Sequence, residues 1–573
     1  MKYNLFLFLF FSFFVSYTQT INLNESHIID YLRTAQLSGK IKSKISFTQR
    51  PLEIGKNSIE IEEKIFNKEE YAPTIFSFFN GNGKLKLLPI DYNIEFNSNH
   101  PYNRNNGSMI PNTGYQQLVS AGLYAEIGPL SIQLKPEHLY SENKDFEGFG
   151  EGPNGHYPII WSKRYITWNG IDIPERFGEQ KHNKTLIGQS SIRINYKKLS
   201  LGISNENLWW GPSKRNSIMM SNHARGFKHI TFNTINPIET KIGNFEWQFV
   251  TGRLENSGFT PPNTDYSYAG TRLYVPKINQ NGLTNDWRYF QGITVSYSPK
   301  WVSGLSIGFI RWVQMYSALV RGKYYWMNGK PSYFPLFSNL FRKNDKSSDY
   351  EAQTDQAAGL FFRWIWEDSG AEIYAEYYYN DAKQNLRDLL LDSDHARAAT
   401  IGIQKVINSK NSDYEYLFSW EWTQLEQTSG RIIREAGSWY RHGFVYDGFT
   451  NNGEVLGAGI GPGSNSHYFA LNRFKKEEKI GIAFEIIDQD NDFYYRAFES
   501  AKDYRRYWKT YNLQLNFEKK LKNIWFSFNL IYSRDLNYQW DLEDYATPYY
   551  HPGNDVNNLH STLKLTYLIP FAN

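Results

Sequence analysis

Residues 561–571 read STLKLTYLIPF, and this stretch near the C-terminus decides the fold class. Leu563, Leu565 and Tyr567 alternate with polar residues, so one face of the segment is apolar, as in a half-exposed β-strand. A last strand of this kind, with the aromatic Phe571 close to the end of the chain, is typical of a barrel in a membrane, where the last strand must pair with the first. We therefore expect the chain to close on itself.

The same alternation recurs upstream in segments of about ten residues, separated by clusters of Gly, Asn, Asp and Pro. The connections between these segments are alternately short and long, as periplasmic turns and outer loops are in a transmembrane barrel. A crossing strand needs roughly 9–11 tilted residues, so residues 84–573 have room for roughly 16–18 strands. We predict an all-β fold, a transmembrane antiparallel β-barrel. The clearest strands are 90–96, 123–127 with 130–134, 192–196 with 199–203, 360–366 with 371–379, and a pair within 511–532.

The composition fits a barrel with an apolar outer face and a polar interior. Of the 573 residues, 17% are aromatic and 21% charged, and the mean hydropathy is −0.57. These values disfavour both a bundle of membrane helices and a disordered chain, but a soluble secreted β-protein shares them and stays open as the alternative. The chain has no cysteine, which excludes disulfides, thiolate metal sites and a lipid-modified N-terminal cysteine. Its net charge of +4 does not indicate nucleic-acid binding.

The first residues predict a cleaved secretory signal. Lys2 precedes an apolar run from Leu5 to Val15, and Ser16 and Thr18 are small residues of the kind that a cleavage site favours. The run is too short to cross a bilayer as a helix. The chain is therefore expected to leave the cytoplasm and to reside in the cell outer membrane.

Three regions follow from these patterns. We expect residues 1–18 to be the signal peptide, residues 19–83 a small periplasmic N-terminal region, and residues 84–573 the barrel. Within the N-terminal region, residues 24–39 predict one short helix, whereas residues 57–71 are ambiguous between helix and strand.

Aromatic residues gather at the ends of the expected strands. In a transmembrane barrel they would form the girdles at the two membrane interfaces, whereas in a soluble β-sandwich they would pack in the core. The signal sequence favours the girdles. The residues are Trp364, Trp366, Tyr377, Tyr378, Tyr379, Trp420 and Trp422.

Residues 205–213 read NENLWWGPS, and residues 221–225 read SNHAR. Together they resemble the signature of the capsule assembly (Wzi-type) outer-membrane protein family. Segments 85–95, 121–137 and 457–466 resemble further parts of that family, so the likeness runs from about residue 85 to near the C-terminus. The resemblance implies a many-stranded barrel with a periplasmic helical part and a lectin-like role in attaching or organising capsular polysaccharide. The N-terminal helical bundle of the best-known members has only one expected short helix as its counterpart.

The signature segment carries side chains that suit polysaccharide binding. Sugars are recognised by flat apolar faces and planar hydrogen-bonding groups, and acidic capsules favour arginine. Trp209, Trp210, Arg215, Asn222 and Arg225 supply these groups. The alternative is that the tryptophans fill the lumen or a girdle and that the Gly-Pro pair only turns the chain.

A second candidate is the long segment 143–182, which contains Trp161 and Trp168. Loops of this length are usually functional or disordered. We expect it either to fold into the lumen or to present a ligand-facing surface outside, with a plain surface loop as the alternative.

Other motifs carry weaker signals. Residues 461–465 are glycine-rich but lack the lysine of a phosphate loop, so they predict a tight turn. Asp488, Asp490, Asp492 and Glu499 resemble a calcium loop, but Phe493 stands where such a loop needs glycine, which favours an acidic loop tip instead. We identify no catalytic residues, no metal ligands and no cofactor motif, and expect no enzyme.

The favoured function is a non-catalytic outer-membrane barrel that binds or organises capsular or extracellular polysaccharide. A porin-like channel and a structural or secretion-accessory barrel are the alternatives. Expected partners are surface polysaccharide, outer-membrane lipid and lipopolysaccharide, and the barrel-assembly machinery, whose signal the C-terminal strand resembles. We expect a monomer.

Overall fold

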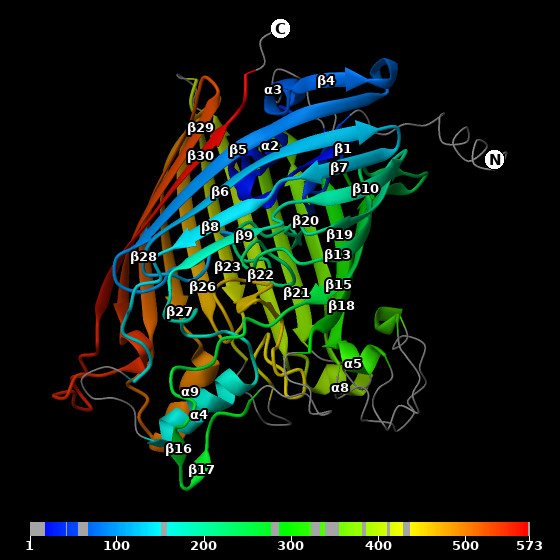
Figure 1. Cartoon of the computed structure of the whole chain (residues 1–573). Coiled ribbons are helices and arrows are strands. Elements are labelled where there is room, and N and C mark those ends of the chain that lie inside the picture. The colour runs from blue at the N-terminus through cyan, green and yellow to red at the C-terminus, as the bar shows by residue number, and fades with distance from the viewer. Residues whose placement is uncertain are drawn as a thin grey trace.

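The chain forms a β-barrel with a filled interior (Figure 1). The computed structural model describes residues 18–41, 43–55, 67–150, 158–276, 286–321, 333–337, 354–380, 386–408, 413–427 and 436–570. The predicted signal sequence up to residue 17, most of segment 57–71 and Phe571 lie outside the described residues.

The barrel closes through 18 antiparallel strands, which confirms the predicted fold class. Two of these strands are interrupted. Pro136 separates the two parts of one of them, because proline has no N–H for the ladder. In chain order the strands are β5 (Gly83–Asn97), β6 (Gly114–Ile127), β7 (Leu130–Leu134) continued by β8 (Glu137–Ser141), β9 (His182–Leu186) continued by β10 (Ser191–Tyr196), β11 (Leu199–Ser204), β13 (His229–Thr234), β15 (Gly243–Leu254), β18 (Arg288–Pro299), β19 (Leu305–Tyr316), β20 (Asp355–Trp366), β21 (Ala371–Asn380), β22 (Arg397–Asn408), β23 (Glu415–Gln424), β26 (Asn465–Lys475), β27 (Glu478–Asp488), β28 (Lys509–Leu521), β29 (Ile524–Leu536) and β30 (Val556–Tyr567).

The C-terminal strand closes the barrel as its alternation predicts. β30 pairs with β5, so that Leu563 lies opposite Ile94 and Leu565 opposite Tyr92. This pairing leaves no free edge between the first and last strands of the barrel, as a lipid environment requires.

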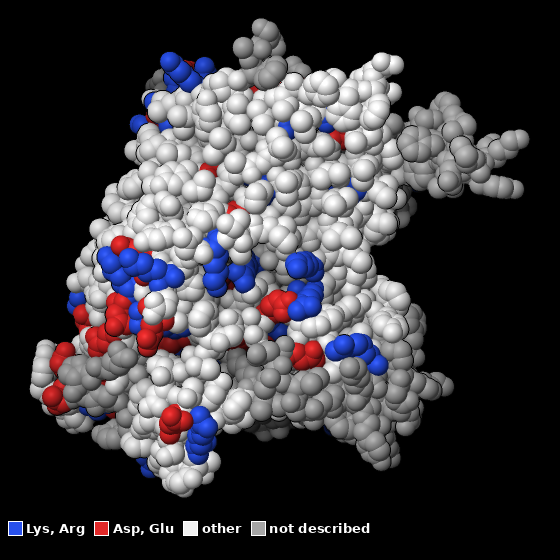
Figure 2. Space-filling view, in the orientation of Figure 1, with Lys and Arg blue, Asp and Glu red and all other residues white. Residues whose placement is uncertain are grey.

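The side chains of the wall alternate in the sense of a membrane barrel. On β10, Ile192 and Ile194 are 53% and 50% exposed and face outward, whereas Arg193 and Asn195 are buried in the lumen. Apolar residues therefore face outward and polar residues inward, the reverse of a soluble protein. On the visible face the wall is largely free of charged residues, which gather toward the end with the long loops (Figure 2).

The predicted aromatic pairs have outward positions at both ends of the wall. Trp364 and Trp366 lie beside the turn between β20 and β21, with ring centroids 4.9 Å apart. Tyr377 and Tyr379 lie toward the other end of β21, whereas Tyr378 between them points inward and is fully buried.

N-terminal residues occupy the lumen at the end with the short turns. They comprise β1 (Thr18–Ile21), helix α2 (Ser26–Leu37), β2 (Gln49–Arg50) and β3 (Leu52–Gly55). Ile28 and Leu32 of α2 pack in one buried cluster with the wall residues Leu88, Tyr124 and Trp525. The helix predicted for residues 24–39 is thus present, and it ends before Gly39, whose φ of +70° no helix continues through. Because residues 18–55 pack inside the barrel, the division into a periplasmic region and a barrel stays a prediction.

Two long loops fill the outer part of the lumen. Residues 205–228 and 439–460 contribute most of a buried cluster in which the Trp312 and Phe449 rings stack with centroids 4.0 Å apart. The glycine-rich residues 461–465 form a turn with positive φ at Gly461 and Gly463, as predicted.

Outside the barrel, the long loops build a small folded head. It contains α4 (Pro158–Asn169), α9 (Asn491–Ala501) and the ribbon of β16 (Ser267–Tyr268) and β17 (Thr271–Arg272), at the bottom of Figure 1. None of the helices within the described ranges is both long and apolar enough to cross a membrane.

Candidate functional site

The signature segment lies inside the barrel, where it joins the N-terminal residues to the wall. β12 (Trp209–Trp210) pairs with β2, and Trp209 lies opposite Arg50. Trp209 is 4% exposed and stacks against the Arg50 guanidinium at 5.0 Å, and Trp210 is fully buried and donates to Gln248 Oε1 over 2.7 Å. Both rings fill the lumen, which is the structural alternative weighed from the sequence.

The glycine of the Gly-Pro pair after the tryptophans is required for a steric reason. Gly211 has a φ of +109°, and a Cβ there would overlap the carboxylate of Glu376 on β21. Ser213 donates two hydrogen bonds to that carboxylate, from its backbone N–H over 3.0 Å and from its hydroxyl over 2.6 Å. Pro212 offers its carbonyl to Arg33 of α2 over 2.7 Å.

The polar residues of the signature separate into two environments. Asn222 is buried and donates to the carbonyl of Asn105, and Arg225 donates to Asn452, so both tie luminal loops together. Arg215 instead lines a cavity. Its guanidinium lies 4.5 Å from the Tyr468 ring.

Trp161 and Trp168 belong to the core of the outer head. Both lie on α4 and pack with Phe493 of α9 and with Trp540. The Arg164 guanidinium is enclosed among rings, 4.9 Å from the centroid of Trp168 and 5.4 Å from those of Phe493 and Trp540. Of segment 143–182, helix α4 thus belongs to the outer head, where most of Trp168 is inaccessible, whereas Ile171 packs in the luminal cluster. Residues 151–157 lie outside the described residues.

The acidic residues that resemble a calcium loop have partners within the protein. Asp490 caps α9 by accepting from Phe493 N over 3.0 Å and forms an ion pair with Arg441 at 2.6 Å. Asp492 is buried and accepts from Gln427 N over 2.9 Å. Burial, together with the nearby charge of Asp490, raises the pKa of Asp492 to about 6.

A set of exposed tyrosines at the outer end was not singled out from the sequence. Two loops carry them, at 502–508 and 541–553, and these loops touch, because Arg505 Nη1 donates to the carbonyl of Ala546 over 3.3 Å. Tyr549 is 98% exposed, and the other four are at least 42% exposed. The run 547–552, TPYYHP, in an outer loop is the sequence signal that points to them. This tyrosine rim comprises Tyr504, Tyr507, Tyr545, Tyr549 and Tyr550.

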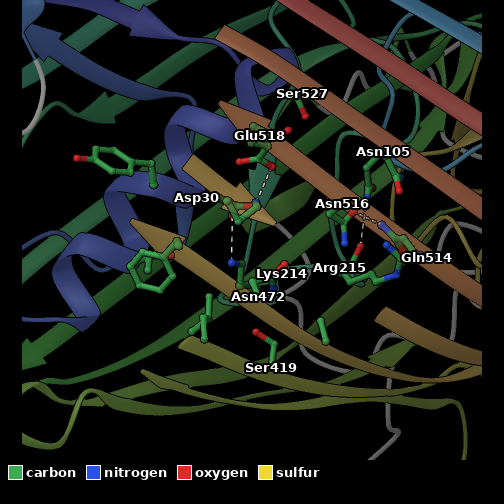
Figure 3. A pocket seen from close by; sticks show the side chains of 18 of the residues that line it. Asp30, Asn105, Lys214, Arg215, Ser419, Asn472, Gln514, Asn516, Glu518 and Ser527 are labelled. Atoms are coloured by element: carbon green, nitrogen blue, oxygen red, sulfur yellow. Dashed lines mark hydrogen bonds and ion pairs between the residues drawn. The ribbon is translucent and has the colours of Figure 1, made fainter. Parts of the chain in front are cut away.

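A cavity of about 330 Å³ lies in the lumen between α2 and the inner face of β23 and β26 to β30 (Figure 3). Alternation within the strands supplies its lining: Gln514 and Asn516 both point inward from β28, and Gln514 donates to Asn516 over 2.8 Å. Across the cavity, Lys214 of the signature segment forms an ion pair with Asp30 of α2 at 3.3 Å. This luminal cavity reaches the short-turn end at Lys476 and Glu477, in the turn between β26 and β27.

Comparison with known proteins gives a family and a fold. The model of the family described as capsule assembly protein Wzi matches residues 99–534. Among solved structures, Wzi of Escherichia coli, an outer membrane protein involved in group 1 capsule assembly and described as a carbohydrate binding β-barrel, is 12% identical, with a TM-score of 0.56 over 97% of this chain and 99% of that chain. OpdQ and OprD of Pseudomonas aeruginosa also match, at 11% and 9% identity, over 86% and 87% of this chain and 98% and 97% of theirs, with TM-scores of 0.36 and 0.38. None of the curated proteins compared with the chain matches it.

Proposed function

Because the chain belongs to the capsule assembly protein Wzi family, as the resemblance of residues 205–225 predicted, we propose that it binds and organises capsular or extracellular polysaccharide at the cell surface. It does so as a non-catalytic, monomeric barrel in the outer membrane. Its apolar wall contacts lipid and lipopolysaccharide, and the barrel-assembly machinery inserts it.

The orientation follows from the connections between strands. Short turns face the periplasm and long loops face outward in barrels of this type. The N-terminal residues and α2 then lie at the periplasmic end, and the head with α4 and α9 lies outside. In the proposed arrangement, the N-terminal region inserts into the periplasmic end of the lumen, and the division into signal peptide 1–18, N-terminal region 19–83 and barrel 84–573 stays a prediction.

The tyrosine rim carries the proposal. Tyrosine offers a flat apolar face and a hydroxyl, which suits stacking against a sugar ring and hydrogen bonding to its hydroxyls. Five such side chains on two touching loops, with Tyr549 almost fully exposed, form a broad contact surface at the outer end. Of the residues proposed from the sequence, Trp209, Trp210, Asn222, Arg225, Trp161 and Trp168 support the loops, and Arg215 faces the luminal cavity.

The test is a glycan-binding assay on the detergent-purified protein, using polysaccharide from the surface of its own host. Replacing Tyr549 and Tyr550 together by alanine is expected to weaken binding at least roughly tenfold, because stacked aromatic contacts are lost. Tyr196→Ala is the matched control, an exposed tyrosine at the opposite end of the barrel. If the wild-type protein binds no host glycan, the proposed function fails.

The two alternatives predict different results. A porin would give stable conductance in planar bilayers, whereas the luminal loops and α2 predict little or none. A secretion-accessory barrel would co-purify with a stoichiometric envelope protein. A deletion strain that still makes polysaccharide but sheds it into the medium favours the binding role over both.

A further inference from the structure

The luminal cavity shares no lining residue with the tyrosine rim and reaches the opposite end of the barrel at Lys476 and Glu477. Its volume of about 330 Å³ falls within the range of small-molecule sites and would hold roughly one or two sugar residues. Charged side chains and side-chain amides make up most of its polar lining, and aromatic rings line it at Tyr102, Tyr468 and Trp525, among others. The amides are Asn105, Asn106, Gln404, Asn472, Gln514, Asn516 and Asn529.

The carboxylates around the cavity have ion-pair or hydrogen-bond partners within the protein. Asp30 pairs with Lys214 at 3.3 Å, and Glu518 pairs with Lys479 at 2.5 Å. Glu95 accepts from two amide side chains, over 2.9 and 2.8 Å. At the short-turn end of the cavity, Glu478 pairs with Lys519 at 2.7 Å.

Glu421, deeper in the lumen, is satisfied by donors of the signature segment. It accepts from the backbone N–H groups of Lys214 and Asn216 over 2.9 and 2.8 Å, and from the Tyr374 hydroxyl over 2.7 Å. The acidic side chains of the cavity are thus committed to protein partners.

Two cations on the cavity wall lack such partners. Within the described part of the chain, neither Arg104 nor Lys564 has a carboxylate oxygen within 4.0 Å. Arg104 lies 5.7 Å from the Tyr102 ring, and its Nε is buried without a hydrogen-bond acceptor. Lys564 projects inward from β30 between the outward Leu563 and Leu565. Arg104 and Lys564 are therefore cations of the cavity that no adjacent carboxylate of the described residues pairs with.

We propose that the luminal cavity is a second ligand site, which binds the acidic sugar of a short oligosaccharide from the periplasmic end. Arg104 and Lys564 each offer charge-assisted hydrogen bonds to a sugar carboxylate, which are stronger than hydrogen bonds between neutral groups. The amides bind the hydroxyls, and the rings of Tyr468 and Trp525 offer faces for the sugar C–H surface. The direction of entry rests on the proposed function, which sets the orientation in the membrane.

The absence of cysteine makes a direct occupancy test possible. Ser527 lines the cavity from β29, and Ser527→Cys would place the only thiol of the full chain there. The rate of its alkylation by iodoacetamide is measured in detergent, alone and with tri-galacturonate, with neutral maltotriose, or with inorganic phosphate. Heat-modifiable migration in SDS gels verifies that each variant retains a folded barrel.

Tri-galacturonate is expected to slow the alkylation severalfold, and maltotriose and phosphate much less. Arg104→Gln and Lys564→Met should each raise the half-protecting concentration of tri-galacturonate roughly tenfold. Lys300→Met is the matched control, an exposed lysine in a short turn at the same end, and should leave protection unchanged.

No protection by tri-galacturonate would overturn the site. Equal protection by maltotriose would overturn the role of the two cations, and equal protection by phosphate would overturn the assignment to a saccharide. Host polysaccharide binding that depends on Tyr549 and Tyr550 is measured separately, so the luminal site can fail while the proposed surface function stands.

Discussion

Arg33 on the luminal helix α2 donates two hydrogen bonds to Glu372 on the barrel wall, over 3.2 and 2.8 Å, and the side chains are only 1% and 0% exposed. Arg363 on the neighbouring strand β20 donates to the other oxygen of the same carboxylate, over 2.8 and 2.6 Å. One buried carboxylate thus compensates two buried guanidinium groups. The contact joins residues 339 apart in the sequence and anchors α2 inside the barrel.

Glu372→Gln is expected to destabilise the barrel more than a typical polar substitution. It leaves Arg33 and Arg363 buried without a counter-charge, and breaking a buried pair in this way costs about 3–5 kcal/mol. The free energy of unfolding in urea measures this cost. Glu239→Gln, in an exposed ion pair with Lys44, is the control and should change it little. Equal effects of the two substitutions would show that the Arg33 contact does not anchor α2.

Gly211→Ala should disturb the signature segment specifically. The residue has a φ of +109°, and a Cβ would overlap the Glu376 carboxylate that accepts from Ser213. We expect a loss of about 1–3 kcal/mol in the free energy of unfolding, from strain and overpacking. Gly437→Ala is the control, because a Cβ there meets no atom within 4 Å and its φ is not positive. If Gly211→Ala left the stability unchanged, position 211 would not require glycine for steric reasons.

The wall was predictable because its signal is local. Alternation along 192–203 already separates outward isoleucines from inward Arg193 and Asn195, and the short turn at 197–198 sets the pairing of the two strands. Even the inward direction of Lys564 follows from its outward neighbours on β30. The count of 18 strands also falls within the predicted range, because the connections are long or short in regular alternation.

The site was less predictable because loop paths depend on distant contacts. Trp209 and Trp210 carry the chemistry of a sugar-binding pair, but pairing with Gln49 and Arg50 draws them into the lumen. The alternation of residues within a strand does not indicate which segments pair when they lie so far apart in the sequence. Likewise, the sequence gives the charge of Lys564 but not the lack of a carboxylate beside it.

Trp209→Ala separates a structural role from direct sugar contact. The ring packs in the cluster that holds α2, so its removal should cost about 3–5 kcal/mol of stability. The folded fraction should bind host polysaccharide with unchanged affinity. The two quantities come from unfolding in urea and from the glycan-binding assay, with the Tyr549 and Tyr550 double variant as the converse case. A stable Trp209→Ala protein that has lost glycan binding would instead place this residue at the ligand.

The outer head should become more stable as the pH falls from 7 toward 5. The pKa of Asp492 is raised to about 6 by burial and by the charge of Asp490, whereas in an unfolded chain it returns to about 4. The folded protein therefore binds a proton at the Asp492 carboxyl more tightly than the unfolded chain does, so protonation stabilises the fold. The stabilisation is fully present below about pH 4 and is lost as the pH rises through about 6, with a total of about 2–3 kcal/mol.

Asp492→Asn mimics the protonated form and should remove this pH dependence while leaving the contacts of Asp490 with Arg441 and Phe493 in place. Tryptophan fluorescence during urea unfolding at pH 5 and pH 7 compares the two proteins, since Trp161, Trp168 and Trp540 pack beside α9. An identical pH response of wild type and Asp492→Asn would mean that this carboxyl does not control the stability of the head.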